Sequence, residues 1–301
     1  MNKKISLLLP TRGRPSLLKR LFQSFVQHSA DLRNLEIILC LDDDDPESHK
    51  IEDSRLNIVK IIGTHSTMGD YNTKCLEASS GELIMLMNDD LVVMTPKWDR
   101  IIREFSATIP DDIYLAYPDD MEGARIPTFP ILPRKTCDIL CNPFPKEYQD
   151  LFIDLHVLDI FQRLKRLGKN RIFYLDHVRL DHRHFVAGKV RRDATYTCKN
   201  RYKDTLTFLS FRHTRQISAK RLFAGIDGTP LPPLPKQTPM EREPSNLAHA
   251  LVMYFSLCLT DHGLPFLTRL QWFLRFTKYH AAMKSGLSFL KRQSYTLYGS
   301  G

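Results

Sequence analysis

The sequence has no apolar run long enough to cross a lipid bilayer. A spanning helix needs roughly 20 apolar residues, whereas the run from Ile5 to Leu9 is stopped by Pro10 and the run from Leu251 to Leu259 is too short. The first run also has only about half the length of the apolar region of a signal peptide. We therefore expect a soluble or peripheral protein of the cytoplasm, with Ile5 to Leu9 as a first buried strand.

A paired-cysteine motif is also missing. The six cysteines are scattered, without a CxxC pair or the spacing of a zinc site, so neither a disulfide framework nor a structural zinc is indicated. We expect reduced thiols, as is usual in the cytoplasm. The cysteines are Cys40, Cys75, Cys137, Cys141, Cys198 and Cys258.

Charged residues are abundant but unevenly distributed. Residues 1–133 hold 15 basic and 21 acidic residues (net −6), residues 134–221 hold 20 and 9 (net +11), and residues 222–301 hold 8 and 4 (net +4). An acidic first part suits cation binding, and a basic middle part suits an anionic ligand. Because solvated surface charge gives the same pattern, the charge distribution alone does not decide a function.

Residues 1–118 alternate apolar runs with helical patterns. This alternation predicts βαβ units around a mainly parallel sheet. Helices are expected from Pro15 to about Phe25, from Asp70 to Ala78 and from Pro96 to Phe105. The expected strands are Ile5–Leu9, Leu35–Leu41, Asn57–Ile62, Leu83–Met87 and Ile113–Tyr117.

Several of these strands end in acidic residues. The second runs into the cluster 42–45, the fourth into Asn88-Asp89-Asp90, and the fifth into Pro118-Asp119-Asp120. In open α/β sheets the ligand crevice lies beyond the carboxyl ends of the strands, so the acids of the second and fourth strands are expected to converge there. A carboxylate pair is a suitable seat for Mg²⁺ or Mn²⁺. A strand-ending acidic turn would explain either cluster equally well.

The remainder of the chain is less regular. The segment 123–146 is rich in proline and is expected to be an extended loop. An amphipathic helix is expected from Lys146 to Leu167, with Gly168 as its stop, followed by a strand from Arg171 to Leu175. We expect one domain over residues 1–225 (halves 1–118 and 119–225), a proline-rich linker over 226–244, and a helical extension over 245–301. Packing of that extension on the domain is favoured over contact with a membrane surface.

The order of these features resembles the family 2 glycosyltransferases with the GT-A fold, over about residues 4–200. The stretch from Gly69 to Asp90 resembles the block in which an Asn-bearing helix, a small-Gly-Glu turn and an apolar strand lead into a DxD-type metal motif. Leu8 to Pro15 resembles the first strand and nucleotide loop, and Glu36 to Asp45 resembles the second strand with its uracil-contacting acid. The resemblance implies a Rossmann-like, mixed but mainly parallel α/β sheet flanked by helices.

The resemblance also assigns roles to individual residues. Asp90 is expected to be the principal metal ligand, and Asp89 to support the donor ribose or the metal. Asn88 departs from the commoner Asp at the first place of the motif and is not assigned as a ligand. The residues expected to bind the nucleotide sugar are Pro10, Thr11, Arg12, Asp42, Asp44, Asn72 and Asp89.

A second block, from Asp181 to Tyr196, resembles the late His-containing loop of bacterial members of the family. There an imidazole completes the metal shell, and basic residues hold the diphosphate. His182 is assigned as that ligand, with His184 as the alternative, because imidazole suits Mn²⁺. The candidate phosphate-binding residues are Lys189, Arg191 and Arg192.

The acceptor hydroxyl requires a base. Asp150 and Asp154 are four residues apart and would share a face of the predicted 146–167 helix. Asp154 resembles the acid of the family's acceptor-side helix and is assigned as the base, although a carboxylate complementing the helix dipole would explain Asp150 equally well. Trp98 either stacks on a sugar ring or belongs to the core.

The sequence therefore predicts a metal-dependent glycosyltransferase. It would move a sugar from a nucleotide diphosphate donor, a UDP-sugar in first place, to a hydroxyl of a glycan or glycolipid, with Mn²⁺ or Mg²⁺ as cofactor. An inverting mechanism and a role in bacterial surface-polysaccharide biosynthesis follow from the resemblance alone. Peripheral contact with the inner face of the membrane through the C-terminal helices is a further expectation.

Three other functions are considered. A nucleotidyltransferase is disfavoured because Pro10 to Arg14 lacks the repeated glycines of a phosphate loop. A nucleic-acid-binding module could use the basic segment 134–221 and its aromatic residues, but no recognisable nucleic-acid motif accompanies them. A catalytically inactive sugar-binding scaffold is disfavoured by the intact Asp89-Asp90 pair.

Overall fold

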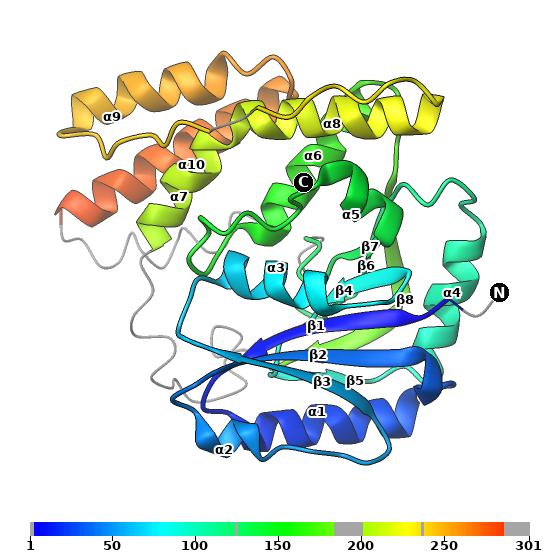
Figure 1. Cartoon of the computed structure of the whole chain (residues 1–301). Helices are drawn as coiled ribbons and strands as arrows, with labels where there is room; N and C mark the ends of the chain where they lie inside the picture. Colours follow the sequence, from blue (N-terminus) through cyan, green and yellow to red (C-terminus); the bar gives the residue numbers. More distant parts are fainter. Residues whose placement is uncertain (1–2, 124–125, 184–200, 236–237, 286–301) are drawn as a thin grey trace.

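The chain folds around one eight-stranded sheet in the computed structural model, which describes residues 3–123, 126–183, 201–235 and 238–285. The strand order is β3-β2-β1-β4-β7-β6-β8-β5. Parallel pairing joins β3, β2, β1 and β4, whereas β7 is antiparallel to β4 and β6, and β5 is antiparallel to β8. The predicted mixed, mainly parallel α/β sheet is thus confirmed (Figure 1). The strands are β1 (Ile5–Thr11), β2 (Leu35–Asp42), β3 (Asn57–Gly63), β4 (Leu83–Leu86), β5 (Leu91–Val93), β6 (Leu115–Asp119), β7 (Ile131–Pro133) and β8 (Ile172–His182).

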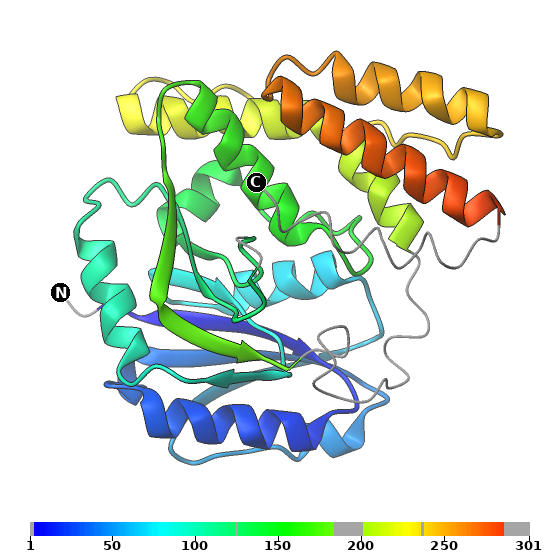
Figure 2. The same ribbon diagram turned by 180° about the vertical axis from the view of Figure 1, so that it is seen from behind.

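Helices cover both faces of the sheet (Figures 1 and 2). α1 and α4 pack on one face, and α3, α5 and α6 pack on the other. The helices of this part of the chain are α1 (Pro15–His28), η1 (Leu32–Asn34), α2 (Pro46–His49), α3 (Met68–Ala78), α4 (Trp98–Ala107), α5 (Arg134–Leu140) and α6 (Ile153–Arg166).

The central strands are buried on both faces. Along β1, Leu7 and Leu9 pack on the side of α1, while Leu8 packs on the side of α3 and α6. Successive side chains of a strand point to opposite faces, so a strand covered on both sides needs apolar residues at every position. This is why the strands appear in the sequence as continuous apolar runs.

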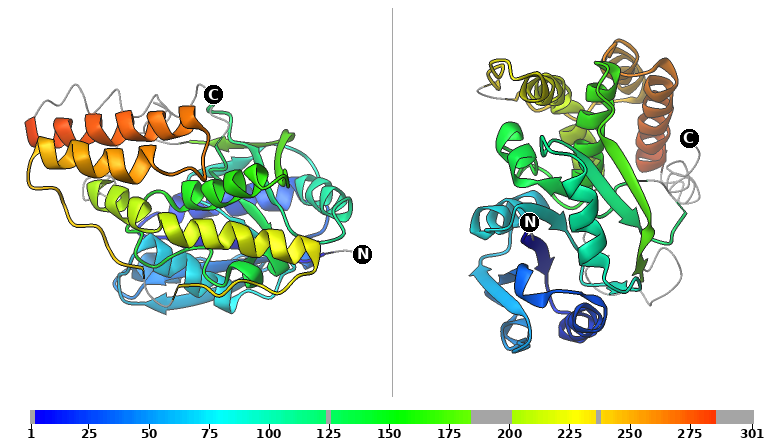
Figure 3. Two further views of the ribbon diagram at one scale, coloured as in Figure 1. Left: turned by 90° about the horizontal axis from the view of Figure 1, so that it is seen from above. Right: turned by 90° about the vertical axis from the view of Figure 1, so that its right-hand side faces the viewer.

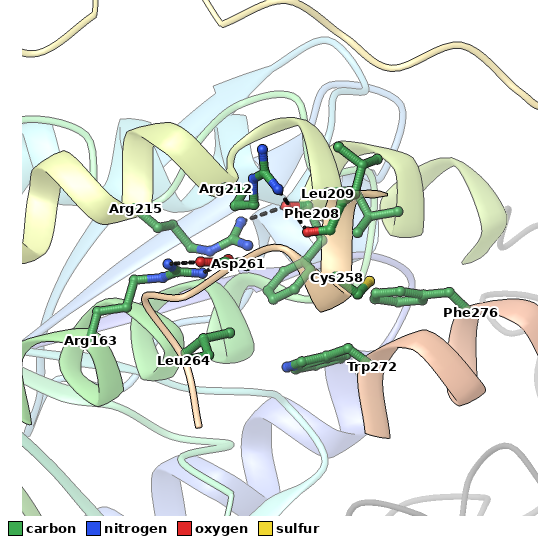
Figure 4. Close-up of a pocket in the computed structure, with 11 residues that line it drawn as sticks. Arg163, Phe208, Leu209, Arg212, Arg215, Cys258, Asp261, Leu264, Trp272 and Phe276 are labelled. Atoms are coloured by element: carbon green, nitrogen blue, oxygen red, sulfur yellow. Dashed lines mark hydrogen bonds and ion pairs between the residues drawn. The ribbon is translucent and has the colours of Figure 1, made fainter. Parts of the chain in front are cut away.

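The C-terminal helices form a further layer on α6, and Figure 3 shows them lying across the sheet domain. Figure 4 shows how this layer is attached: Arg163 Nη2 lies 2.6 Å from Asp261 Oδ2. Asp159 lies 2.7 Å from Arg163 Nε and 2.5 Å from Arg215 Nε, and a cavity of about 20 Å³ remains nearby, room for about one water molecule. One side of the C-terminal helices thus packs on the domain, as predicted. The elements are α7 (Arg201–Ser210), α8 (Arg212–Asp227), α9 (Leu247–Tyr254), the π-helical turn η3 (Phe255–Leu259) and α10 (Phe266–Ser285).

The helix predicted from Lys146 to Leu167 is wrong at its start, since α6 begins at Ile153. Phe152 has a left-handed φ of 74°. The backbone amides of residues 149, 150 and 151 donate to the Asp204 carboxylate at 2.7, 3.0 and 2.9 Å. Asp150 therefore lies in a loop that a distant residue holds, and it does not share a helix face with Asp154.

Two other expectations are corrected. The segment 123–146, expected to be an extended loop, contains β7 and α5. The strand predicted from Arg171 to Leu175 continues to His182, where it pairs with β5; the first two residues of the block assigned to a loop therefore belong to a strand. Among the described residues, no helix has the length and apolar character to span a membrane.

Candidate functional site

The end of β1 joins the two acidic clusters that follow β2 and β4. Because β1 lies between these strands, its last residue and the loop after it reach both. Thr11 Oγ1 donates to Asp89 Oδ2 at 2.5 Å, and Arg12 bonds Asp42 and also Asp44, the latter at 2.7 Å. The predicted convergence of acids at the carboxyl ends of the parallel strands is thus present, with a threonine and an arginine between them.

Asp42 lies at the centre of a small polar cluster. It is 2% exposed and accepts from Tyr71 Oη and Arg12, and its Oδ2 lies 2.9 Å from His65 Nδ1. Although burial favours the neutral acid, the hydrogen bonds from Tyr71, His65 and Arg12 hold the pKa of Asp42 below its ordinary value. His65 is largely exposed and meets the Tyr71 ring edge-on at 6.3 Å between centroids. A carboxylate beside two aromatic rings suits a planar base, which can donate a hydrogen bond to the acid and stack on a ring.

Asp89 is buried beneath the loop that follows β1. Arg14 Nη1 lies 3.0 Å from its Oδ1, opposite the Thr11 contact. Burial raises the pKa of Asp89, and Arg14 and Thr11 oppose that rise. Asp45, in the same region, accepts from the Gly13 amide at 2.6 Å and so holds the loop against the end of β2. The loop that would meet a nucleotide is therefore fixed at both ends.

Asp90 faces a second group of possible metal ligands. His182 Nε2 lies 3.3 Å from Asp90 Oδ1, and His182 Nδ1 lies 3.5 Å from Glu122 Oε1. The ligand atoms of Asp120, Glu122 and His182 all lie within 4.8 Å of one another. Burial disfavours the imidazolium, yet Asp90, Glu122 and Asp120 raise the pKa of His182. Carboxylate oxygens with one imidazole fit a divalent cation such as Mn²⁺.

Asp154 lies in the first turn of α6, beside the possible metal ligands around His182. Burial raises its pKa to about 6, a nearby Asp120 adds to the rise, and a hydrogen bond of 2.8 Å from the Leu155 amide opposes it. The positive charge of Arg275 on α10 also lowers its pKa. The carboxyl is partly exposed, and a pKa of about 6 suits a general base.

The other predicted residues lie as follows. Pro10 is in β1 next to Thr11, and Asp44 is exposed except for its bond to Arg12. Asn72 is buried, and its side chain donates to the Met68 carbonyl within α3 at 2.9 Å. Trp98 is fully buried against Phe25 and belongs to the core. Outside the described residues lie His184, Lys189, Arg191 and Arg192.

Sequence reasoning did not assign five residues of this arrangement. Asp120 belongs to the acidic end of the fifth predicted strand and Glu122 lies two residues later, so the strand-end rule that selected Asp42 and Asp90 also indicated this region. Tyr71 adjoins the predicted Asn72. No sequence pattern predicts that His65 contacts Asp42, because this contact depends on the conformation of the loop 64–67. The missed residues are Arg14, His65, Tyr71, Asp120 and Glu122.

Comparison with known proteins gives the fold. Neither a protein-family model nor a curated protein sequence matches the chain. It is similar to S. aureus TarS, with a TM-score of 0.52 and 11% identity over 97% of this chain and 54% of that one. It is also similar to the mannosyltransferase PcManGT from Pyrobaculum calidifontis, solved with GDP-Man and Mn²⁺, with a TM-score of 0.51 and 10% identity over 99% and 80% of the two chains. The chain spans about half the length of TarS, and the shared fold is of the GT-A type.

Proposed function

We propose that this protein is a metal-dependent glycosyltransferase that uses a nucleotide-sugar donor. One observation carries the proposal: the ends of β1, β2 and β4 join the polar cluster around Asp42, the Asp89-Asp90 pair and the His182 group through a series of side-chain contacts. A sugar transferase needs a base site, a place for a charged diphosphate and an acceptor-activating residue side by side. The mannosyltransferase of similar fold was solved with both GDP-Man and Mn²⁺, which supports the proposal.

In this proposal the nucleotide lies over the end of β1. Asp42, with Tyr71 and His65 beside it, receives the base, and a UDP-sugar is the donor in first place. Thr11, Arg12 and Asp89 line the ribose and the start of the diphosphate. Arg12 pairs with two carboxylates, so it acts as a fixed side of the proposed site rather than as a free phosphate ligand.

Asp90 and His182 would hold the divalent cation. Asp120 and Glu122, whose ligand atoms lie within 4.8 Å of one another and of His182, would be further ligands. When bound, the cation neutralises the charge of the departing diphosphate. The imidazole of His182 favours Mn²⁺ over Mg²⁺, since Mg²⁺ prefers an all-oxygen shell. Asn88 is exposed and takes no part in this cluster.

Asp154 accepts the proton of an acceptor hydroxyl belonging to a glycan or glycolipid. The hydroxyl oxygen attacks the anomeric carbon, and the bond to the diphosphate breaks in the same displacement, so the configuration inverts. The carboxylate is ionised at neutral pH but, with a pKa of about 6, retains a useful affinity for a proton.

The nucleic-acid alternative loses support from the positions of the arginines. Within the basic segment 134–221, Arg163, Arg215 and Arg221 are buried and engaged in internal bonds. Part of the +11 charge of this segment is thus internal and cannot contact phosphates in a groove.

The test is a screen of UDP-, GDP- and other nucleotide sugars for binding and hydrolysis, with and without Mn²⁺. Asp90→Asn should reduce metal-dependent turnover by about 100-fold or more, because several kcal/mol of charge stabilisation are lost. Asn88→Ala, the neighbouring exposed position, should retain both activity and Mn²⁺ affinity. If no nucleotide sugar binds, or if Asp90→Asn behaves like wild type, the proposed function is wrong.

A further inference from the structure

The pair of helices α9 and α10 has one buried and one exposed apolar side. The buried side, which includes Tyr254 and Phe276, belongs to the core shared with α6 and α8. The opposite side exposes large apolar side chains, and Val252 and Leu267 are both 70% exposed. The rings of Phe255 and Phe273, 6.4 Å apart, connect the two helices. We define the outer face as Leu251, Val252, Phe255, Phe266, Leu267 and Leu274.

The two helices that carry the outer face expose no carboxylate. In residues 245–285, which span α9, η3 and α10, Asp261 is the only acidic residue. It is buried and pairs with Arg163. On the adjoining helices, Asp204 of α7 is buried, and Asp227 at the end of α8 is exposed. Lysines are exposed on the same layer, at positions 203, 220 and 278. An exposed apolar strip with basic residues and without carboxylates is complementary to an anionic lipid surface.

The outer face belongs to helices that also reach the acceptor side of the proposed site. Arg275 of α10 lies over the Phe152 ring, 5.9 Å from its centroid, and its charge acts on Asp154. Figures 1 and 2 both show the far end of α10 extending past the side of the molecule at which β1 and β2 end. A surface that held α9 and α10 would therefore lie beside the acceptor-binding part of the chain.

We propose that the outer face of α9 and α10 docks in the plane of an anionic lipid bilayer. Val252, Phe255, Phe266 and Leu267 enter the boundary between headgroups and acyl chains, and the neighbouring lysines contact lipid phosphates. The helices lie in the interface and do not cross it. Docking is independent of the proposed transferase function; its consequence, that the acceptor hydroxyl belongs to a lipid-linked molecule, rests on that function.

Docking is tested by co-sedimentation of the full chain with phosphatidylcholine vesicles that contain or lack phosphatidylglycerol. The wild type should bind the anionic vesicles, and added salt should weaken binding because it screens the lysines. Val252→Glu/Leu267→Glu should lower partitioning by at least tenfold while donor hydrolysis in solution stays unchanged. Circular dichroism checks the fold, and Val252→Ser/Leu267→Ser repeats the test without added charge.

The matched control is Met94→Glu/Leu167→Glu, which adds the same charges at exposed apolar positions outside these helices. It should bind vesicles like the wild type. The proposal is overturned if wild-type protein stays in the supernatant with anionic vesicles, or if the control loses binding equally. It is also overturned if the wild type does not bind vesicles but forms a dimer, and the Val252/Leu267 variants are monomers. The outer face is then an interface between two copies. Loss of donor hydrolysis in every variant would count against the transferase proposal and not against docking.

Discussion

Asp154 combines a catalytic assignment with a cost in stability. A carboxyl whose pKa is raised by burial is most favourable in the folded state when it is neutral, yet a general base must be ionised. Many proteins keep a functional group at such a position although an uncharged residue of the same shape would make the fold more stable. Asp154 can therefore be tested through activity and through stability independently.

We predict that Asp154→Asn reduces turnover by about 10²- to 10⁴-fold. In the wild type, kcat/KM should fall below a pH of about 6, where Asp154 becomes protonated. The folded pKa lies above the ordinary value of 3.8, so the folded state binds more protons than the unfolded state. Wild-type stability should thus decline as pH rises from about 4 to 6, and the Asn variant should gain roughly 1–3 kcal/mol relative to it.

Urea unfolding at several pH values, together with pH–rate profiles, measures both effects. Asp150→Asn is the control, because Asp150 lies in the loop before α6 and has no assigned role. It should retain the acidic limb of the profile and most of the activity. If Asp150→Asn abolishes turnover while Asp154→Asn keeps the limb, the base has been assigned to the wrong residue.

Single residues of the site were predictable where a short-range rule selects them. Asp42, Asp89 and Asp90 follow apolar strands directly, and parallel strands bring such ends together whatever the loops do. His65 and Glu122 depend on how two loops fold back over the sheet. Periodicity carries no information about such contacts. The sequence thus identified the acids at the strand ends but not the rings and acids that surround them.

Secondary-structure elements also divide into those that a local pattern predicts and those that a distant contact determines. The apolar strands β1, β2 and β4 were predicted within a residue or two, because burial on both faces leaves a continuous signal. The start of α6 was not predicted. Asp204 lies some 50 positions further along the chain, and its carboxylate accepts the amides that would otherwise have continued the helix. An N-terminal boundary set by a distant side chain is invisible to local capping rules.

Helix α3 packs closely against the loop before α6, and a substitution at Gly69 tests this contact. A Cβ at Gly69 would overlap the Pro145 carbonyl and the Lys146 backbone. Backbone atoms cannot yield as a flexible side chain can, so Gly69→Ala should cost about 1–3 kcal/mol of unfolding free energy. At Gly63 an added Cβ meets nothing within 4 Å, and Gly63→Ala should stay within about 0.5 kcal/mol of wild type.

Chemical unfolding of the two alanine variants makes the comparison. If both variants lose the same unfolding free energy, α3 and the loop can move apart with little loss of stability. Gly69→Ala should also weaken donor binding, because Tyr71, two residues further along α3, contacts Asp42.

At the scale of the whole molecule, the sheet and the C-terminal helices share one core. A continuous apolar cluster runs from Leu8 and Ile84 of the sheet to Tyr254 and Phe276 of the extension. Two buried pairs connect α6 to the C-terminal helices at the same boundary: Arg163 pairs with Asp261, and Asp159 pairs with Arg215. Shared apolar contacts and buried ion pairs predict that the extension unfolds together with the sheet, rather than as a separate domain.

The two tryptophans allow this to be measured, since Trp98 lies in the core beside α1 and Trp272 lies in α10 against Phe276. In each of the single-tryptophan variants Trp98→Phe and Trp272→Phe, the urea transitions followed by tryptophan fluorescence and by far-UV circular dichroism should coincide. In both backgrounds Asp261→Ala should lower the unfolding free energy by about 3–5 kcal/mol, because it leaves the buried Arg163 charge without this partner. Asp227→Ala, which breaks the partly exposed pair with Lys169, should cost at most about 1 kcal/mol. If Asp261→Ala shifts the Trp272 transition alone, the C-terminal helices are an independent unit, and their packing on α6 contributes little to the stability of the sheet.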